Sequence, residues 1–229
     1  MATFVLVHGS CHGGWCWKRV TPLLSKDSHE VYTPTLTGLG ERSHSVSRDI
    51  GLDTHIRDII QVLEYENLNE VTLVGHSYGG LVIGGVAEKI PERIRRLVYL
   101  DAYIPQDNKS AFDIIPGLET IYKERTLKEH GREWLVASYK PEEFGVTNPN
   151  DIDWMNPRLS PMPWHTHDQP LRITNPKAES YICCTEFGNV QFKAQKSQAD
   201  WDYHELMKAD DAMITAPKEL VQLLETTDK

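Results

Sequence analysis

The stretch of residues 71–83, VTLVGHSYGGLVI, constrains the fold more than any other part of the chain. It combines an apolar strand-like run, a tight turn and a glycine-rich start of a helix. Within it, Gly75-His76-Ser77-Tyr78-Gly79 fits the pattern G-x-S-x-G, in which a serine stands on a sharp strand-to-helix turn. Glycines two residues before and after the serine remove the Cβ atoms that would clash where strand and helix close up. The stretch therefore predicts a nucleophile elbow with Ser77 at its corner.

A serine hydroxyl at such a corner needs help from its surroundings, because it is a weak nucleophile on its own. It requires an oxyanion hole, a base and usually an acid that orients the base. The backbone N–H of Tyr78, at the start of the helix, is one expected oxyanion donor. The other is expected from the glycine-rich loop His8–Trp15, which directly follows the first strand-like run.

Apolar strand-like runs alternate with helical patterns along most of the chain. Because strands joined through helices form right-handed crossovers, this alternation predicts an α/β protein with a mostly parallel, doubly wound sheet. The expected strands are Thr3–Val7, Glu30–Pro34, Val71–Val74, Arg96–Asp101, Glu179–Thr185 and Trp201–Met207. The expected helices are Trp15–Leu24, Thr54–Leu68 with Asp53 or Thr54 as its N-cap, the helix after the elbow, and Pro217–Leu224.

The alternation breaks between Pro105 and Pro170, where proline, tryptophan and charged residues are frequent. This segment lies between two core strands, so it is predicted to be a helical cap without strands rather than a separate domain. The predicted organisation is a core of residues 1–104 and 171–229 with a cap of residues 105–170. Cap tryptophans are expected to roof an apolar pocket above Ser77. They are Trp134, Trp154 and Trp164.

Composition narrows the classes of partner. The formal net charge of -9, with no cluster of lysine and arginine, argues against nucleic-acid binding. The first nine residues lack the basic region and the apolar length of a secretory signal, and no stretch approaches a membrane span. A cytoplasmic protein without a membrane partner is therefore expected. The cysteines have neither metal-ligand spacing nor the density of a disulfide scaffold, so no metal site is expected. They are Cys11, Cys16, Cys183 and Cys184.

Four motifs together resemble one family. They are His8–Trp15, Thr35–Gly40, Gly75–Gly80 and Leu97–Ala102. The chain is similar, nearly end to end, to α/β-hydrolases of the plant methylesterase and hydroxynitrile lyase type, and especially to their bacterial esterase-like relatives. The resemblance implies an α/β-hydrolase fold and a cofactor-free esterase that acts on a small-molecule ester as a monomer or homodimer. It also implies that the N–H of Ser10 is the second oxyanion donor, and Gly9 and His12 are expected to line the substrate pocket. The family's hydroxynitrile lyases carry a threonine at the position of Gly9, so lyase activity is disfavoured.

The same resemblance implies an aspartate as the triad acid. The plant members place it in the turn after the strand that here ends at Thr185, where this chain has Glu186-Phe187-Gly188-Asn189. The bacterial relatives place it at the end of the strand that follows the elbow helix, where this chain has Asp101. Asp101 is therefore the predicted acid and Glu186 the reserve, with a capping role for Asp101 as the alternative interpretation.

The position of the triad base departs from the family pattern. The family's histidine lies in a Gly-His-Asp-x-Met setting, and the matching residues here are Ala209-Asp210-Asp211-Ala212-Met213. Asp210 thus occupies the histidine's place. A carboxyl with a reference pKa near ~3.9 accepts a serine proton poorly at neutral pH, unless burial or a second carboxylate such as Asp101 raises that pKa. Three explanations stay open: a substitution made to inactivate an esterase, a natural loss of hydrolysis, and an unusual base.

Other histidines are weaker candidates for the base. His76 is expected to point away from Ser77 across the elbow, and His204 lies too far along its strand from Asp210. His165 and His167 reach Ser77 only if the cap folds down. The preferred function is serine-dependent hydrolysis of a small apolar carboxylic ester, with the base weakened or lost at Asp210. The alternatives are a small-ligand-binding protein on the same scaffold and a lyase that uses the oxyanion hole alone.

Overall fold

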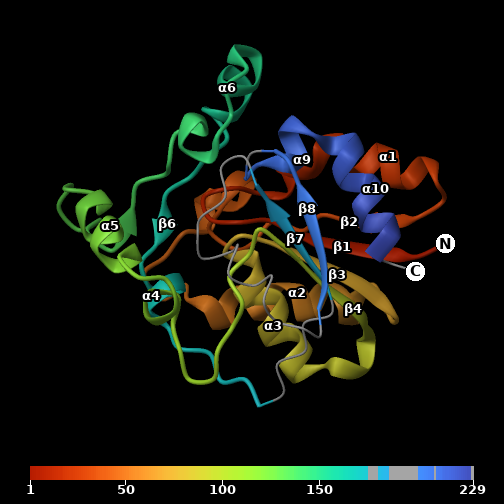
Figure 1. The fold of residues 1–229 in the computed structure, drawn as a ribbon. Helices are drawn as coiled ribbons and strands as arrows, with labels where there is room; N and C mark the ends of the chain where they lie inside the picture. Colours follow the sequence, from red (N-terminus) through yellow and green to blue (C-terminus); the bar gives the residue numbers. More distant parts are fainter. Residues whose placement is uncertain (175–179, 186–200, 209, 228–229) are drawn as a thin grey trace.

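The predicted alternation of strands and helices produces one parallel sheet in the computed structural model of the protein (Figure 1). The structure describes residues 1–174, 180–185, 201–208 and 210–227. Six strands of this described part lie in the order β2-β1-β3-β4-β7-β8, and all their pairings are parallel. The strands are β1 Thr3–Val7, β2 Glu30–Tyr32, β3 Val71–His76, β4 Ile94–Leu100, β7 Ser180–Cys184 and β8 Asp202–Leu206.

Helices cover both faces of this sheet, so the sheet is doubly wound (Figure 1). Successive residues of a strand point to opposite faces. In β1, for example, Val5 and Val7 pack with α2 and α3 on one face, while Phe4 and Leu6 pack with α1 and α10 on the other. The helices are α1 Thr21–Lys26, α2 Leu52–Tyr65, α3 Gly79–Lys89, α9 Ala212–Thr215 and α10 Pro217–Thr227. Short 3₁₀ helices lie at Gly14–Arg19, Gly40–Ser45 and Pro91–Arg93. None of the helices in the described residues is long and apolar enough to cross a membrane.

Helix α2 begins earlier than predicted, and neither Asp53 nor Thr54 is its N-cap. The helix starts at Leu52, and Gly51 is the residue at the N-cap position. Leu52 is buried in the core, which draws the first turn inward. The Thr54 hydroxyl accepts a hydrogen bond from the Gly51 N–H at 3.4 Å, so it supports the helix start from inside the first turn.

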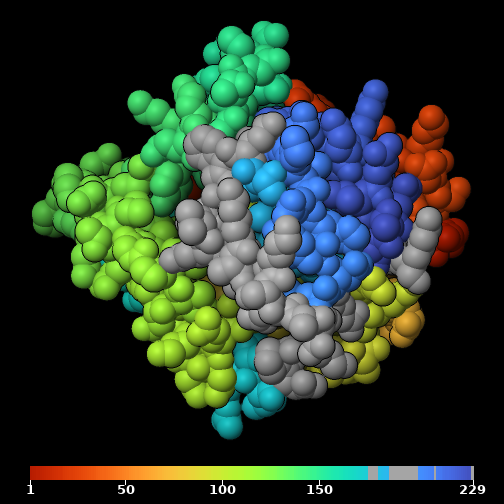
Figure 2. Space-filling view, in the orientation of Figure 1, coloured from red at the N-terminus to blue at the C-terminus, as the bar shows by residue number. Residues whose placement is uncertain are grey.

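The segment between residues 105 and 170 contributes no strand to the main sheet, and its helices α5 and α6 project beyond the core (Figure 1). The expectation that it lacks strands is wrong, because β5 and β6 form a two-stranded antiparallel ladder. Each strand has two residues, too few to leave an alternating pattern in the sequence. The elements are α4 Ala111–Ile114, α5 Leu118–Arg125, β5 Leu135–Val136, a 3₁₀ helix Pro141–Phe144, α6 Pro149–Met155, β6 Met162–Pro163 and α7 His165–Asp168. In Figure 2 this segment, in green, borders one side of the face that also exposes the C-terminal elements in blue.

The strand order brings two loops together at the carboxyl end of the sheet. After β1 the chain passes to β2 on one side, and it then returns to place β3 on the other side of β1. Loops that leave neighbouring strands at such a switch point form the crevice where α/β proteins bind their ligands. Val7 pairs with Gly75, and His76 pairs with Leu100. The residues that follow β1, β3 and β4 therefore lie side by side at the carboxyl edge of the sheet.

Candidate active site

Ser77 stands at the corner between β3 and α3, as predicted. Its φ angle is 51°, in the left-handed region that residues with a Cβ rarely adopt. Backbone closes the corner on both sides: a Cβ on Gly75 would lie 2.6 Å from the Gly79 carbonyl oxygen, and a Cβ on Gly79 would lie 2.8 Å from the Val7 carbonyl oxygen. The Ser77 N–H donates to the carbonyl of Leu100 at 3.2 Å. The serine is thus fixed, half-buried, between three strand ends.

Ser10 lies in the loop after β1 and contacts the cap. Its side-chain oxygen is 3.2 Å from Nε2 of His167 in α7, and the hydroxyl of Tyr122 in α5 is 2.8 Å from the same nitrogen. Burial lowers the pKa of His167 to about 3, so this ring is neutral at pH 7. The sequence argument concerned a reach of His167 to Ser77, whereas the contact in the structure is with Ser10. In the structure, the cap reaches the loop that carries the predicted oxyanion donor.

Tyr78 follows Ser77 and is the N-cap residue of α3, so its backbone N–H lies at the helix N-terminus. Its buried ring stacks on the His167 ring, with centroids 4.7 Å apart. Its hydroxyl is 2.9 Å from Nδ1 of His55, whose Nε2 is 2.9 Å from the Thr37 carbonyl. Because a carbonyl only accepts, Nε2 carries the imidazole proton and Nδ1 accepts from Tyr78. Burial lowers the pKa of His55 to about 4, which agrees with this neutral form.

Asp101 directly follows β4, with a φ angle of 41° and an exposed fraction of 2 %. The Cys184 N–H donates to its Oδ1 at 3.4 Å. Burial, followed by repulsion from Asp210, raises the pKa of Asp101 to about 8. At neutral pH this acid is therefore protonated, and it hydrogen-bonds Asp210. The structure thus brings the two predicted catalytic carboxyls together, while Glu186, the reserve acid, lies outside the described residues.

His76, which is expected to point away from Ser77 across the elbow, lies against the predicted position of the base. Its Nε2 lies 3.0 Å from Oδ1 of Asp210. The ring is 1 % exposed, and its Nδ1 has no hydrogen-bond partner among the described residues. A Cβ on Gly9 would lie 2.9 Å from this Nδ1 and 3.0 Å from the Ser77 Cβ, so Gly9 packs directly between His76 and the serine. Burial alone would lower the pKa of His76, but the attraction of Asp210 outweighs it and the pKa is raised.

His12 and Asp211 form a second buried pair beside the first. His12 Nε2 is 3.1 Å from Asp211 Oδ2, and both side chains are fully buried. His12 Nδ1 is 2.7 Å from the Ser10 carbonyl oxygen. Both nitrogens therefore face acceptors and both carry protons. Although burial opposes it, the Asp211 carboxylate raises the pKa of His12. His12 thus supports the backbone of Ser10 from a buried position.

Two residues of this site, Tyr103 and Asp211, were not predicted as functional, and His167 was weighed only as a weaker candidate for the base. Tyr103 hydrogen-bonds the Ser77 side chain, and burial raises its pKa. Asp211 is paired with His12, and His167 contacts both predicted oxyanion residues, Ser10 and Tyr78. Asp211 could have been identified from its position next to Asp210 in the loop motif. Tyr103 could have been identified from its position two residues after Asp101, at the end of a strand.

Trp134 and Trp164 line a cavity of about 390 Å³ at the edge of the cap. Its other lining residues are Arg48, Glu133, His165 and Asp168. These side chains are charged or polar, and Ser77 is not among them. Trp154 packs instead on Trp15, with ring centroids 5.2 Å apart. A tryptophan roof above Ser77 therefore stays a prediction.

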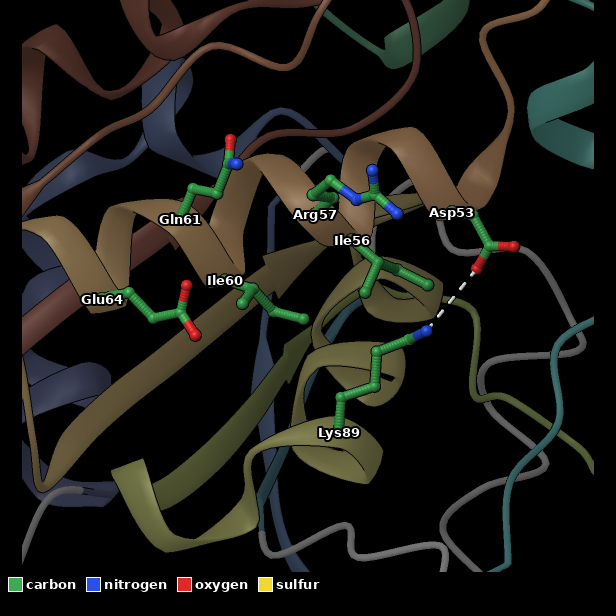
Figure 3. Close-up of a pocket in the computed structure, with 7 residues that line it drawn as sticks. All are labelled: Asp53, Ile56, Arg57, Ile60, Gln61, Glu64 and Lys89. Carbon is green, nitrogen blue, oxygen red and sulfur yellow. Dashed lines mark ion pairs between the residues drawn. The ribbon is translucent and has the colours of Figure 1, made fainter.

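A cavity of about 460 Å³ lies between α2 and the end of α3 (Figure 3). Its rim includes Lys89 and Asp53, whose charged groups are 4.0 Å apart. The remaining lining residues, Ile56, Arg57, Ile60, Gln61 and Glu64, all belong to α2. None of them is a predicted site residue, and this cavity has no nucleophile. The chemistry of the elbow is therefore separate from it.

The fold agrees with a comparison of the chain with protein families. Residues 4–223 match the model of the Alpha/beta hydrolase family, and the chain belongs to this family. An esterase of Nocardioides sp. (strain SG-4G), named for the hydrolysis of carbendazim, is 36% identical over 98% of both chains. The salicylic acid-binding protein 2 of Nicotiana tabacum is 29% identical, over 99% of this chain and 97% of that protein.

A solved structure shows the same fold at lower identity. An extracellular α/β-hydrolase from a Paenibacillus species superposes with a TM-score of 0.81 and 22% sequence identity, over 99% of both chains. The fold class and the resemblance to methylesterases and their bacterial relatives are thereby confirmed.

Proposed function

We propose that the protein is a carboxylic ester hydrolase that uses Ser77 as its nucleophile and acts weakly because Asp210 occupies the place of the base. The observation that carries this proposal is the φ angle of 51° at Ser77, on a strand-to-helix corner beside the loop after β1. Strain of this kind persists where the surrounding structure holds a group for chemistry. The esterase name of the Nocardioides relative supports the same reaction class. The expected substrates are small, fairly apolar esters.

In the proposed reaction, Ser77 Oγ attacks the ester carbonyl carbon, and the carbonyl oxygen gains the negative charge. The backbone N–H groups of Ser10 and Tyr78 then bind this oxyanion, and Asp101 takes the role of orienting acid. The hydroxyl proton must leave as the bond forms. Asp210 is a poor acceptor for it, because His76 and the protonated Asp101 already bond to its carboxylate. The first step is therefore slow.

The test compares the unaltered chain with Asp210→His on short p-nitrophenyl esters, with a chelator present. General base catalysis contributes about 10²–10⁴-fold, so we expect kcat/KM to rise by that order in Asp210→His. The unaltered chain should retain only the weak activity of an oxyanion hole and binding, on the order of 10³–10⁴ over water. Adding Ser77→Ala to Asp210→His should abolish the gain, which shows that the gain passes through the serine.

The opposite outcome has a distinct signature. Brisk hydrolysis by the unaltered chain, abolished by Asp210→Asn and not improved by Asp210→His, would assign the role of base to a carboxylate. Its rate would then follow the ionisation of a carboxyl of raised pKa. Rate constants of all three proteins against pH separate the two mechanisms.

A second candidate function is the binding of a small ligand without turnover. The observation that favours it is the paired state of Asp210, whose carboxylate is already bonded to His76 and Asp101. The Nicotiana tabacum relative is named for binding salicylic acid, so salicylate is a natural first probe. Saturable binding of salicylate by calorimetry, with no hydrolysis even by Asp210→His, would support this candidate over an esterase.

A further inference from the structure

A cluster of histidine and carboxylate groups lies where the triad base is expected. His76, Asp210 and Asp211 each place one nitrogen or oxygen within 4.8 Å of the others. The Nε2 of His76 is 3.0 Å from Asp210 Oδ1 and 4.0 Å from Asp211 Oδ1. Ligand atoms that surround a zinc ion at about 2.0–2.2 Å lie roughly 3–4 Å from one another. Small movements of these side chains would thus suffice to surround an ion.

One oxygen of this cluster lacks a partner. Asp211 is fully buried, and among the described residues its Oδ1 has no hydrogen-bond partner. Its other oxygen, Oδ2, is held by His12 at 3.1 Å. A buried carboxylate oxygen without a donor is costly, and it demands a proton, a water or a cation. This oxygen is directed toward His76 Nε2, the nitrogen that Asp210 also contacts.

The surroundings are those of a metal site. Carboxylates that bind metals are themselves held by hydrogen bonds from an outer layer of residues. Here His12 holds Asp211 at 3.1 Å, and the side chain of Asp101 hydrogen-bonds Asp210. The side chain of Asp210 is 21 % exposed, so a cation can reach the cluster from solvent. One imidazole with two carboxylates suits divalent transition metals, above all zinc, better than magnesium or calcium.

We infer that His76 Nε2, Asp210 and Asp211 form a binding site for one divalent transition-metal ion of the zinc class. The ion takes the place of the proton that His76 Nε2 shares with Asp210. This site shares Asp210 with the proposed hydrolysis, but its ligands do not include Ser77. It also departs from the expectation of no metal, which rested on the spacing of the cysteines.

The test is a calorimetric titration of the chelator-treated full chain with Zn²⁺. We expect saturable binding of one ion per chain. Asp210→Asn and Asp211→Asn keep side-chain shape and each remove one charged ligand. Each should weaken binding by more than the roughly 10- to 100-fold that is typical of losing an outer-layer partner. Mg²⁺ should bind at least tenfold more weakly than Zn²⁺.

Two controls keep the result specific. His204 lies 3.0 Å from Asp202 in a similar pair on β8. Among the described residues this pair belongs to no group of three metal-ligating side chains, so His204→Ala should leave the affinity for Zn²⁺ unchanged. Ser77→Ala should also bind Zn²⁺ normally, which separates this site from the hydrolytic proposal. Circular dichroism and melting temperature establish that each variant is folded. Absence of saturable binding, or an affinity in folded Asp210→Asn or Asp211→Asn that equals that of the unaltered chain, would overturn the inference.

Discussion

Asp210 changes the balance of charge around Ser77 through its own hydrogen bonds. A neutral imidazole both donates and accepts, whereas an ionised carboxylate only accepts. In this protein, the carboxylate accepts from His76 and from the protonated Asp101, and the Ser77 hydroxyl bonds Tyr103. The result is two imidazole–carboxylate pairs, His76 with Asp210 and His12 with Asp211, beside one neutral acid.

Asp101 should make the stability of the protein depend on pH. Its pKa is raised from 3.8 to about 8 by burial and then by Asp210. The folded protein thus keeps a proton that the unfolded chain loses, so this group's contribution to stability falls as pH rises from about 4 to about 8. Asp101→Asn removes the titration but keeps the shape. We expect its free energy of unfolding, relative to the unaltered chain, to increase between about pH 5 and about pH 9 by on the order of a few kcal/mol.

Chemical denaturation of both proteins at the two pH values measures this difference. An offset that is equal at both values would contradict a protonated Asp101. Loss of the whole pH dependence is not expected, because His12 and His76 also have raised pKa values. Their contribution is complete below the unfolded pKa of 6.5 and is lost as pH rises through the raised folded values.

At this scale, the sequence identifies residues but not their partners. Ser77 and Asp210 follow from motifs a few residues long. The partner of His76 is 134 residues away and that of His12 is 199 residues away, so no local pattern reports either pair. The orientation of His76 depends on where the loop of Asp210 lies, which only the assembled sheet determines.

The elbow shows how two elements fix each other through the absence of side chains. A Cβ on Gly80, in the first turn of α3, would lie 2.2 Å from the Tyr103 carbonyl oxygen and 2.9 Å from the Ala102 Cβ. The chain after β4 therefore presses directly on the helix that follows Ser77. Helix propensity alone favours alanine over glycine by about 1 kcal/mol, and here packing reverses that preference.

We expect Gly80→Ala to lower the free energy of unfolding by roughly 1–3 kcal/mol or more, because backbone atoms cannot move aside as a flexible side chain can. Gly117 is a matched control: its φ angle is 82°, but a Cβ there would meet nothing within 4 Å. Gly117→Ala should cost only about 1–2 kcal/mol from its left-handed backbone. Urea unfolding of the two variants measures both values. A stabilised Gly80→Ala would contradict the close approach.

The elements themselves follow closely from patterns in the sequence. Buried parallel strands leave continuous apolar runs, and β1, β3 and β4 lie where those runs predict. The predicted start of α2 was wrong, because the helix begins at the buried Leu52 and has no capping side chain at its N-cap position. The ladder of β5 and β6 is fixed by pairing across the cap, and two residues per strand carry no period of their own.

Across the whole molecule, His167 joins the cap to the core. Its Nε2 contacts the side chains of Tyr122 and Ser10, and its ring stacks on Tyr78. The residue thus links an element of the cap to the loops after β1 and β3. Sequence patterns did not predict this contact, because the packing of the segment 105–170 against the rest of the chain leaves no periodic signal.

His167→Phe keeps a ring against Tyr78 but leaves two buried hydroxyls without their nitrogen partner. Each such loss costs about 1–3 kcal/mol, so we expect a drop of that order in the free energy of unfolding and faster hydrogen exchange in the cap. Adding Tyr122→Phe should recover part of the loss, since one stranded hydroxyl disappears. His165→Phe, at an exposed position of the same helix, is the control and should change stability by less than about 0.5 kcal/mol. Equal effects of the two histidine variants would contradict the role of His167.

The contact between His167 and Ser10 has a consequence for entry of a substrate. A molecule that must push the cap aside to reach Ser77 would pull on the same ring that steadies the loop of Ser10. Displacement of the cap and loosening of the loop that carries the Ser10 N–H would then occur together. Return of the cap would restore both. Substitutions in the cap that shift His167 would thereby change the position of the Ser10 loop before a substrate binds, even where they do not contact the substrate.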